Sequence, residues 1–325
     1  MVVAICLGEI LFDCLMAAVD DGDSMVSLPG GAPANVACGL SRLGTLTAFV
    51  GCIGQDAAGQ DLRACMAAEG VNLQGLQQTA LAPTRKVQVV HDRSGDRKFG
   101  GFISETPRTA AEFADAYLES ETLPEDLFQS AQFLVIGSIG LAYPRSQKAV
   151  HRALQLAKAN KASVFMDINW RSQFWQDPAI APNCIAEIME AVNYLKLSEE
   201  EAEWLFGSQQ ASAIAQKLPH LKGVFVTGGG DAPTRYWLNA FAGEIAPFSV
   251  ATVDTTGAGD GFVAGIIAQL TQRQEELSES VVQDIVCYAN AVGALTTLRP
   301  GAIASLPQAD EVNEFLAAQS QKEQR

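Results

Sequence analysis

The sequence predicts an α/β fold, in which a mainly parallel sheet carries helices on both faces. Short apolar runs of strand length alternate with longer helical patterns nearly throughout the 325 residues. Each run is bounded by Gly, Asp or other polar residues, as buried parallel strands are. The composition agrees: 48% of the residues are hydrophobic and only 18% are charged, which supports a large packed core.

The elements follow one another in a regular order. Five apolar runs, rich in β-branched and other large side chains, are predicted as buried strands: Val2–Leu7, Thr47–Val50, Phe133–Ile136, Val164–Met166 and Val224–Val226. Five segments are predicted as helices: Ala34–Leu43, Gly59–Glu69, Ser146–Asn160, Glu199–Phe206 and Ala211–Leu218. A further strand-like run ends at Val253, and Gly261–Ala268 is apolar all round, which predicts a buried helix.

One region breaks this alternation. Lys86–Val90 and Lys98–Phe102 flank the polar turn Arg93–Asp96, a pattern typical of an antiparallel hairpin. Together with Leu11–Asp13 the hairpin would form a small sheet outside the main one. Such a sheet over a ligand crevice would act as a lid that excludes water, although an ordinary surface hairpin explains the pattern equally well.

Charge and motifs exclude several classes of protein. The net charge of −15 disfavours a nucleic-acid-binding surface, which needs clustered Lys and Arg. It is compatible with one bound nucleotide, because backbone N–H groups and a metal ion can hold phosphates. No apolar run is long enough to span a membrane, and Met1–Leu7 is predicted as a first strand rather than a signal peptide. Seven scattered cysteines without a C-x-x-C pair are typical of a cytoplasmic protein with reduced thiols.

The segment Asp254–Asp260, with the sequence DTTGAGD, is the most informative in the chain. It lies between the run ending at Val253 and the buried helix. Its small residues, Gly257, Ala258 and Gly259, let the backbone approach a ligand closely. Free N–H groups and the positive end of the helix dipole then point at an anion, an arrangement that suits a transferring phosphoryl group.

Asp260 begins this helix. A carboxylate in a first helical turn is common and needs no function. Here, however, it follows an anion-binding turn, where an unused carboxylate would repel the anion. A base positioned to deprotonate an attacking hydroxyl explains the combination better.

A second segment, Gly30–Asn35, reads GGAPAN. Gly-Gly predicts a tight turn, Pro33 suits a helix start, and Asn35 falls in the first turn, where its amide would bind hydroxyls. An ordinary helix entry is the alternative. The motifs G-x-x-x-x-G-K-[ST], G-x-G-x-x-G after the first strand and G-x-S-x-G do not occur, which argues against a Walker P-loop, a dinucleotide site and a Ser/His/Asp hydrolase.

The two segments together, in this order and far apart, resemble the two signatures of the ribokinase-like, phosphofructokinase-B sugar kinases. The resemblance covers about the whole chain and is closest to fructokinases, through Gly8–Asp13, Gly137–Ile139, Asp167–Arg171 and Lys196–Glu201. It implies one ribokinase-like kinase domain over residues 1–325, a three-layer α/β/α sandwich. A small β lid would be built from about residues 11–30 and 84–112, and a homodimer would form through the lids.

The resemblance also implies a role for each matching residue. The sugar would be held by Asp13, Gly30, Gly31, Asn35 and Arg171. Asp260 would deprotonate the attacking hydroxyl, beside an anion hole made by Gly257, Ala258 and Gly259. ATP would be bound by Lys196, Ser198, Glu201, Thr227, Gly229 and Asn290, with Glu201 acting on Mg²⁺ through water. Asp254 and the loop Arg299–Ser305 match a region that binds a monovalent cation such as K⁺ in some relatives.

The implied reaction is ATP-dependent phosphorylation of D-fructose to fructose 6-phosphate. Ribose and 2-keto-3-deoxygluconate are the alternative sugars, and a non-catalytic kinase-like scaffold is the alternative from another class. One departure bears on the sugar. Fructokinases often carry an aromatic-rich lid strand that ends in Arg and is followed closely by Pro and Ala-Asp. Here Lys98–Ile103 lacks that Arg, and the extra residues Ser104–Glu112 precede Ala114-Asp115.

Overall fold

The computed structural model describes residues 2–19, 22–91, 97–273 and 276–323. In this part of the chain a nine-stranded sheet has the order β13-β12-β11-β10-β9-β8-β1-β4-β5. All neighbours from β11 to β5 pair in parallel, and only the β11–β12 and β12–β13 pairs are antiparallel. The predicted α/β fold with a mainly parallel sheet is therefore confirmed.

The strands of this sheet are β1 Ala4–Leu7, β4 Thr47–Gly54, β5 Asn72–Thr79, β8 Phe133–Gly137, β9 Ser163–Asp167, β10 Tyr194–Ser198, β11 Gly223–Thr227, β12 Thr234–Leu238 and β13 Phe241–Ile245. The α-helices are α1 Ala32–Arg42, α2 Ala57–Ala68, α3 Glu125–Phe128, α4 Pro144–Ala159, α5 Ala181–Ile188, α6 Glu199–Phe206, α7 Ala211–Lys217, α8 Ala258–Gln272, α9 Glu279–Thr296, α10 Ala302–Ser305 and α11 Ala309–Glu323. All five strands and all five helices of the predicted alternation are present.

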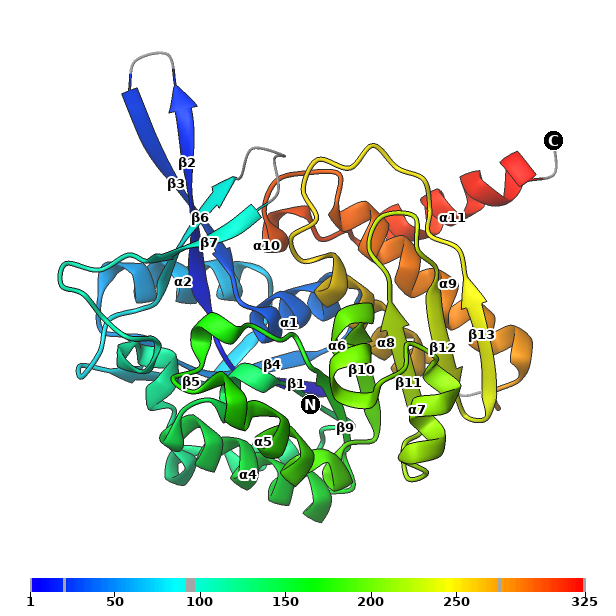
Figure 1. Ribbon diagram of the computed structural model, residues 1–325, viewed down its shortest axis with the longest axis horizontal. Coiled ribbons are helices and arrows are strands. Elements are labelled where there is room, and N and C mark those ends of the chain that lie inside the picture. The colour runs from blue at the N-terminus through cyan, green and yellow to red at the C-terminus, as the bar shows by residue number, and fades with distance from the viewer. Residues whose placement is uncertain (1, 20–21, 92–96, 274–275, 324–325) are drawn as a thin grey trace.

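Alternate residues of each strand face opposite sides of the sheet and build two apolar cores. On β1, Ile5 and Leu7 pack in the core that includes α4, α5 and α7. Their neighbours Ala4 and Cys6 pack in the core that includes α1, α2, α8 and α9. The result is a three-layer α/β/α arrangement (Figure 1). Within the described ranges, no helix is both long enough and apolar enough to cross a membrane.

The prediction of a strand that ends at Val253 is wrong. Residues 246–257 contain no strand. The N–H groups of Val253 and Asp254 donate to the carbonyl oxygen of Thr297, at 2.8 and 3.1 Å, so this segment is bonded to the end of α9 rather than to a neighbouring strand. The apolar pattern suggested a buried strand, but the side chain of Val253 is 63% exposed.

A second sheet of four strands has the order β3-β2-β6-β7 and projects from the main body (Figure 1). Its strands are β2 Leu11–Val19, β3 Gly22–Gly30, β6 Lys86–His91 and β7 Arg97–Phe102. The antiparallel pair of β6 and β7 is the predicted hairpin, and Leu11–Asp13 begins β2. The predicted turn, Arg93–Asp96, lies outside the described residues.

A buried ion pair joins the second sheet to the main body. The side chain of Arg85, immediately before β6, is 0% exposed, and its Nη2 lies 2.8 Å from Oδ2 of Asp115. Asp115 belongs to the segment that follows the extra residues of the predicted lid. Four aromatic rings surround the Arg85 guanidinium, with centroids 4.8 to 5.6 Å away: Phe102, Phe113, Tyr143 and Phe174. Such contacts favour a charged guanidinium in an otherwise apolar place.

Candidate active site

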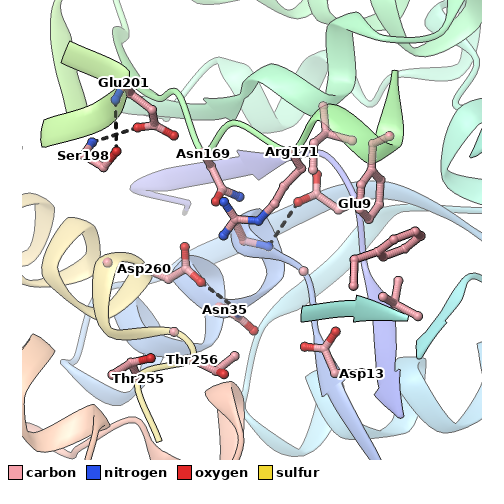
Figure 2. A pocket seen from close by; sticks show the side chains of 18 of the residues that line it. Glu9, Asp13, Asn35, Asn169, Arg171, Ser198, Glu201, Thr255, Thr256 and Asp260 are labelled. Atoms are coloured by element: carbon pink, nitrogen blue, oxygen red, sulfur yellow. Dashed lines mark hydrogen bonds between the residues drawn. The ribbon is translucent and has the colours of Figure 1, made fainter. Parts of the chain in front are cut away.

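A cavity of about 670 Å³ lies at the carboxyl edge of the main sheet, next to the second sheet. The ends of four parallel strands contribute to its wall, through Glu9 after β1, Asn169 after β9, Ser198 at the end of β10 and Thr227 at the end of β11. Open α/β sheets bind ligands at this edge, because the loops that leave the strands converge there. In Figure 2 the side chains of Asn169, Arg171 and Asp260 point toward a common space.

Asp260 and Asn35 meet in this cavity, although 225 positions separate them in the chain. The amide Nδ2 of Asn35, on α1, donates to Oδ2 of Asp260, on α8, at 2.7 Å (Figure 2). Burial raises the pKa of the Asp260 carboxyl, and the Asn35 hydrogen bond and the positive charges of Lys196 and Arg171 offset part of that effect. Asp260 is 9% exposed, and it lines the cavity. The Asn35 amide holds one oxygen of the Asp260 carboxylate, and Asp260 lines the cavity, where a base would be needed.

The three residues predicted to form an anion hole differ in their positions. Gly257 and Gly259 line the cavity, and Ala258 does not. The N–H of Ala258 donates to the carbonyl oxygen of Thr255 at 3.2 Å, so this group is used inside the turn. Gly257 precedes α8 with a φ of 81°, and a Cβ atom there would lie 2.8 Å from Cβ of Ala302. Both the left-handed backbone and the close approach require glycine.

Lys196, from β10, brings a positive charge to the same helix N-terminus. A Cβ atom on Gly259 would lie only 2.9 Å from the Lys196 Nζ, so the lack of a side chain lets the ammonium approach the turn. The ammonium also lies 3.2 Å from a carboxylate oxygen of Asp167. Burial acts to lower the pKa of Lys196, but the nearby carboxylates, Asp167 first, outweigh it and raise that pKa. Lys196 is therefore charged, which suits an anionic ligand.

Glu201 and Ser198 fix the start of α6. Ser198 accepts from the Glu201 N–H at 3.1 Å, and Oε2 of Glu201 accepts from the Ser198 N–H at 2.8 Å (Figure 2). This is a capping box. The other carboxylate oxygen, Oε1, accepts from the N–H of Trp170 at 2.6 Å, which joins the ends of β9 and β10. Because both oxygens already accept backbone hydrogen bonds, the carboxylate is rigidly placed, and contact with a metal through water suits it better than direct ligation.

The side of the cavity next to the second sheet combines one carboxylate with apolar side chains. Asp13, on β2, lines the cavity, and a Cβ atom on Gly30 would lie 2.9 Å from its Oδ2, so Gly30 leaves room for this carboxylate. Arg171 and Gly31 also line the cavity. The apolar side chains there are Leu11, Val87, Val89, Phe99, Ile139 and Phe174. A ligand with hydroxyls on one face and C–H groups on the other matches this wall.

Four predicted site residues do not line the cavity: Gly30 and Ala258, described above, and Asn290 and Asp254. Asn290, on α9, accepts from Thr234 at 2.8 Å through its Oδ1 and does not line the cavity. Asp254 is buried and accepts from the N–H groups of Thr256, at 2.9 Å, and Gly301, at 2.7 Å. It thus ties the turn before α8 to the loop before α10. Thr227 and Gly229, in contrast, line the cavity as expected.

Sequence reasoning assigned no role to Glu9, Asn169 and Asp167. Glu9 and Asn169 line the cavity, and Asp167 is the ion-pair partner of Lys196. A signal was available for each, since all three are polar residues at or just after the end of a buried apolar strand. Asn169 also adopts a φ of 42°, a left-handed conformation that is uncommon outside glycine.

The donor set fits a metal that arrives with phosphates. Among the described residues, no group of three or more His, Cys, Asp or Glu side chains could hold a metal ion. Mg²⁺ in nucleotide sites is usually bound through one or two carboxylates, the phosphates and several waters. Glu201 provides one such carboxylate. Gly229, which lines the same cavity, leaves open space around its backbone, because a Cβ atom there would meet nothing within 4 Å.

The architecture is ribokinase-like, with a mainly parallel central sheet and a small separate sheet. The chain belongs to the pfkB family of carbohydrate kinases, whose family model matches residues 3–309. It is 33% identical over 317 residues to a probable fructokinase-4 of Arabidopsis thaliana, with 95% of each chain covered.

Three solved structures share the fold. A fructokinase from Xylella fastidiosa with bound ATP has a TM-score of 0.88 and 27% identity and covers 98% of this chain and 99% of its own. A putative ribokinase II from E. coli in complex with ATP and Mg²⁺ has a TM-score of 0.85 and 25% identity, covering 98% and 100%. A double mutant of fructokinase from Vibrio cholerae, with fructose, ADP and a potassium ion bound, has a TM-score of 0.84 and 28% identity, covering 97% and 98%.

Proposed function

We propose that this protein transfers the γ-phosphoryl group of ATP to a sugar hydroxyl, with D-fructose as the sugar and fructose 6-phosphate as the product. The observation that carries the proposal is Asp260 itself. It is a buried carboxylate, oriented by Asn35, that faces the same cavity as Gly257 and Gly259 at the N-terminus of α8. A base next to an anion-binding helix N-terminus is the arrangement that attack of a hydroxyl on a phosphoryl group needs.

In this proposal the sugar lies against the second sheet. Asp13 and Asn35 bind its hydroxyls, together with the backbone at Gly30 and Gly31, and Arg171 lies beside it. The apolar side chains of the same wall cover its C–H face, and the second sheet acts as a lid that excludes water. Asp260 takes the proton of the attacking hydroxyl, and the N–H groups at Gly257 and Gly259 stabilise the charge of the transferring group.

ATP lies on the other side of the cavity, near Thr227 and Gly229, with Lys196 contacting its phosphates and Asn290 near its adenine. A bound Mg²⁺ would neutralise charge on the phosphates, and Glu201 would hold it through water. Asp254, which joins two loops, is the proposed ligand of a monovalent cation such as K⁺. The edge strand β3 exposes Met25 and Val26, at 47% and 43%, which supports the proposal of a homodimer through the second sheet.

An assay of ADP release with a panel of sugars tests the proposal. D-Fructose at millimolar concentration is expected to give the highest kcat/KM. A higher kcat/KM with ribose or 2-keto-3-deoxygluconate would identify that sugar as the substrate instead. These sugars stay as alternatives because the sequence of the lid strand, Lys98–Ile103, lacks the arginine that often ends this strand in fructokinases. No phosphoryl transfer to any sugar would instead support a non-catalytic scaffold.

Replacing Asp13 with alanine should raise the KM for the sugar and change kcat much less. A hydrogen bond to a charged group is worth about 1.5–3 kcal/mol, so loss of one such contact corresponds to about a 10- to 100-fold increase in KM. Initial-rate kinetics with varied sugar at saturating ATP measure the effect. Asp61→Ala, at an exposed position of α2, is the control. An unchanged KM for the sugar in Asp13→Ala would exclude this contact.

A further inference from the structure

A buried glutamate, Glu9, lies where the large cavity meets a second, much smaller one. Glu9 is 4% exposed and lines both. The smaller cavity has a volume of about 10 Å³, about the room that one water molecule needs. Asp115, Tyr143 and Ser146 contribute polar side chains to its wall. The position of Glu9 between the two cavities therefore calls for a look at the contacts of its carboxyl group.

The two carboxyl oxygens of Glu9 differ in their contacts. Oε1 accepts a hydrogen bond from the N–H of Ala32, at the start of α1, at 3.1 Å. Oε2 is buried and has no hydrogen-bond partner among the described residues. The backbone N–H groups of Glu9 itself and of Ala32 offset part of the cost of burying a charged carboxylate, but the lack of any partner for Oε2 remains unfavourable for the charged form.

The charged groups around Glu9 do not supply the missing compensation. Asp115, in the short helix η2 (Ala114–Tyr117), and Asp260, on α8, are both acidic and act against a negative charge on Glu9. The phenol of Tyr143 also faces it. Of the nearby cations, Arg85 is paired with Asp115 and Lys196 with Asp167, and Arg171 is exposed at the mouth of the large cavity.

We propose that Glu9 is protonated in the folded protein, with its Oε2–H directed into the small cavity and hydrogen-bonded to one water that also contacts Asp115. The neutral carboxyl keeps its Oε1 as the acceptor for Ala32. It thereby fixes the start of α1, the helix that carries Asn35, without adding a third negative charge to those of Asp115 and Asp260. Glu9 is thus a positioning residue, and its effect on sugar binding, though not its protonation, rests on the proposed function.

Stability should report this proton. Burial, followed by the carboxylate of Asp115, raises the pKa of Glu9 to about 8, whereas an unfolded chain titrates glutamate at about 4.3. Between these two values the folded protein holds a proton that the unfolded chain releases. The free energy of unfolding contributed by Glu9 therefore falls as the pH rises through this window, and the loss is complete above the folded pKa.

Thermal melting of the wild type and of Glu9→Gln between pH 5 and pH 9 tests the protonation. Glutamine keeps a donor and an acceptor but cannot ionise. We expect similar Tm values for the two proteins at pH 5 and a Tm for Glu9→Gln that rises increasingly above the wild type toward pH 9. Glu314→Gln, exposed on α11, controls for loss of one negative charge and should show no such trend. A Tm difference that stays constant between pH 5 and pH 9 overturns the protonation.

Two further measurements test the rest of the inference. In a crystal structure of the wild-type protein, an ordered water between Glu9 and Asp115 is expected, and a well-resolved cavity without one overturns the water bridge. With the best sugar, the wild-type KM should rise several-fold above pH 8, while that of Glu9→Gln should stay nearly flat. Equal pH dependence of the two proteins overturns the positioning role. If no sugar is phosphorylated, the proposed function fails, yet the melting series still decides whether Glu9 holds a proton.

Discussion

Replacing Asp260 with asparagine is expected to lower kcat by about 10²–10⁴-fold, the usual effect of losing a general base. The side chains are nearly the same size, and the Asn35 amide can still donate to an oxygen at position 260, so the cavity should keep its shape. What is lost is the lone pair that accepts the proton of the attacking hydroxyl. Single-turnover and steady-state measurements of sugar phosphate formation would give the size of the effect.

The pH profile and a control variant make this test specific. Because burial raises the pKa of Asp260, the acid limb of the wild-type kcat/KM profile should lie above the ordinary aspartate value of about 3.9, and activity should increase as this carboxyl ionises. That limb should disappear in Asp260→Asn. Asp284→Asn, at an exposed position of α9, should behave like the wild type. Near-normal turnover in Asp260→Asn would refute its role as the base.

The family resemblance assigned Asp260 and Asn35 to one site, and their direct hydrogen bond has a physical reason. Each lies in the first turn of a helix that packs on the same face of the sheet, and glycines before each helix allow a close approach of the backbone. Packing of α1 against α8 then brings the two side chains to hydrogen-bond distance. The alternation of strands and helices was equally predictable, since alternate residues of each strand must be buried on opposite faces.

Other features depend on tertiary contacts that no local pattern reveals. Val253 has the composition of a strand, but its backbone is bonded to the end of α9 and its side chain is exposed. The N–H of Ala258 is used inside the turn, because it donates to the carbonyl oxygen of Thr255. Arg85 looks like a surface residue before a strand, and only its pairing with the distant Asp115 allows complete burial. Charged residues are almost never fully buried unless they are paired.

Replacing Arg85 with methionine should reduce the free energy of unfolding by about 3–5 kcal/mol, the usual cost of removing one partner of a buried ion pair. Besides the ion pair, the Arg85 guanidinium donates to the carbonyl oxygen of Ala110 at 2.8 Å and to the Tyr143 hydroxyl at 3.3 Å. The variant leaves the Asp115 carboxylate buried without its counter-charge. Urea denaturation, followed by tryptophan fluorescence and circular dichroism, would measure the change.

A second substitution separates the loss of charge pairing from the loss of packing. In Arg85→Met/Asp115→Leu no charge is left buried, so the double variant should recover part of the lost stability, since apolar replacement of a whole buried pair is often neutral or stabilising. Arg145→Met is the matched control. Its guanidinium lies 5.0 Å from the ring centre of Tyr117 and pairs with Glu119, but the pair is about half exposed, so its loss should cost less than about 1 kcal/mol.

A double variant no more stable than Arg85→Met would mean that the aromatic rings require the guanidinium itself. A single variant within about 1 kcal/mol of the wild type would show that the ion pair does not stabilise this junction. Because Phe102 lies on β7 and Phe174 lines the large cavity, loosening of the junction should also raise the sugar KM of the folded variant.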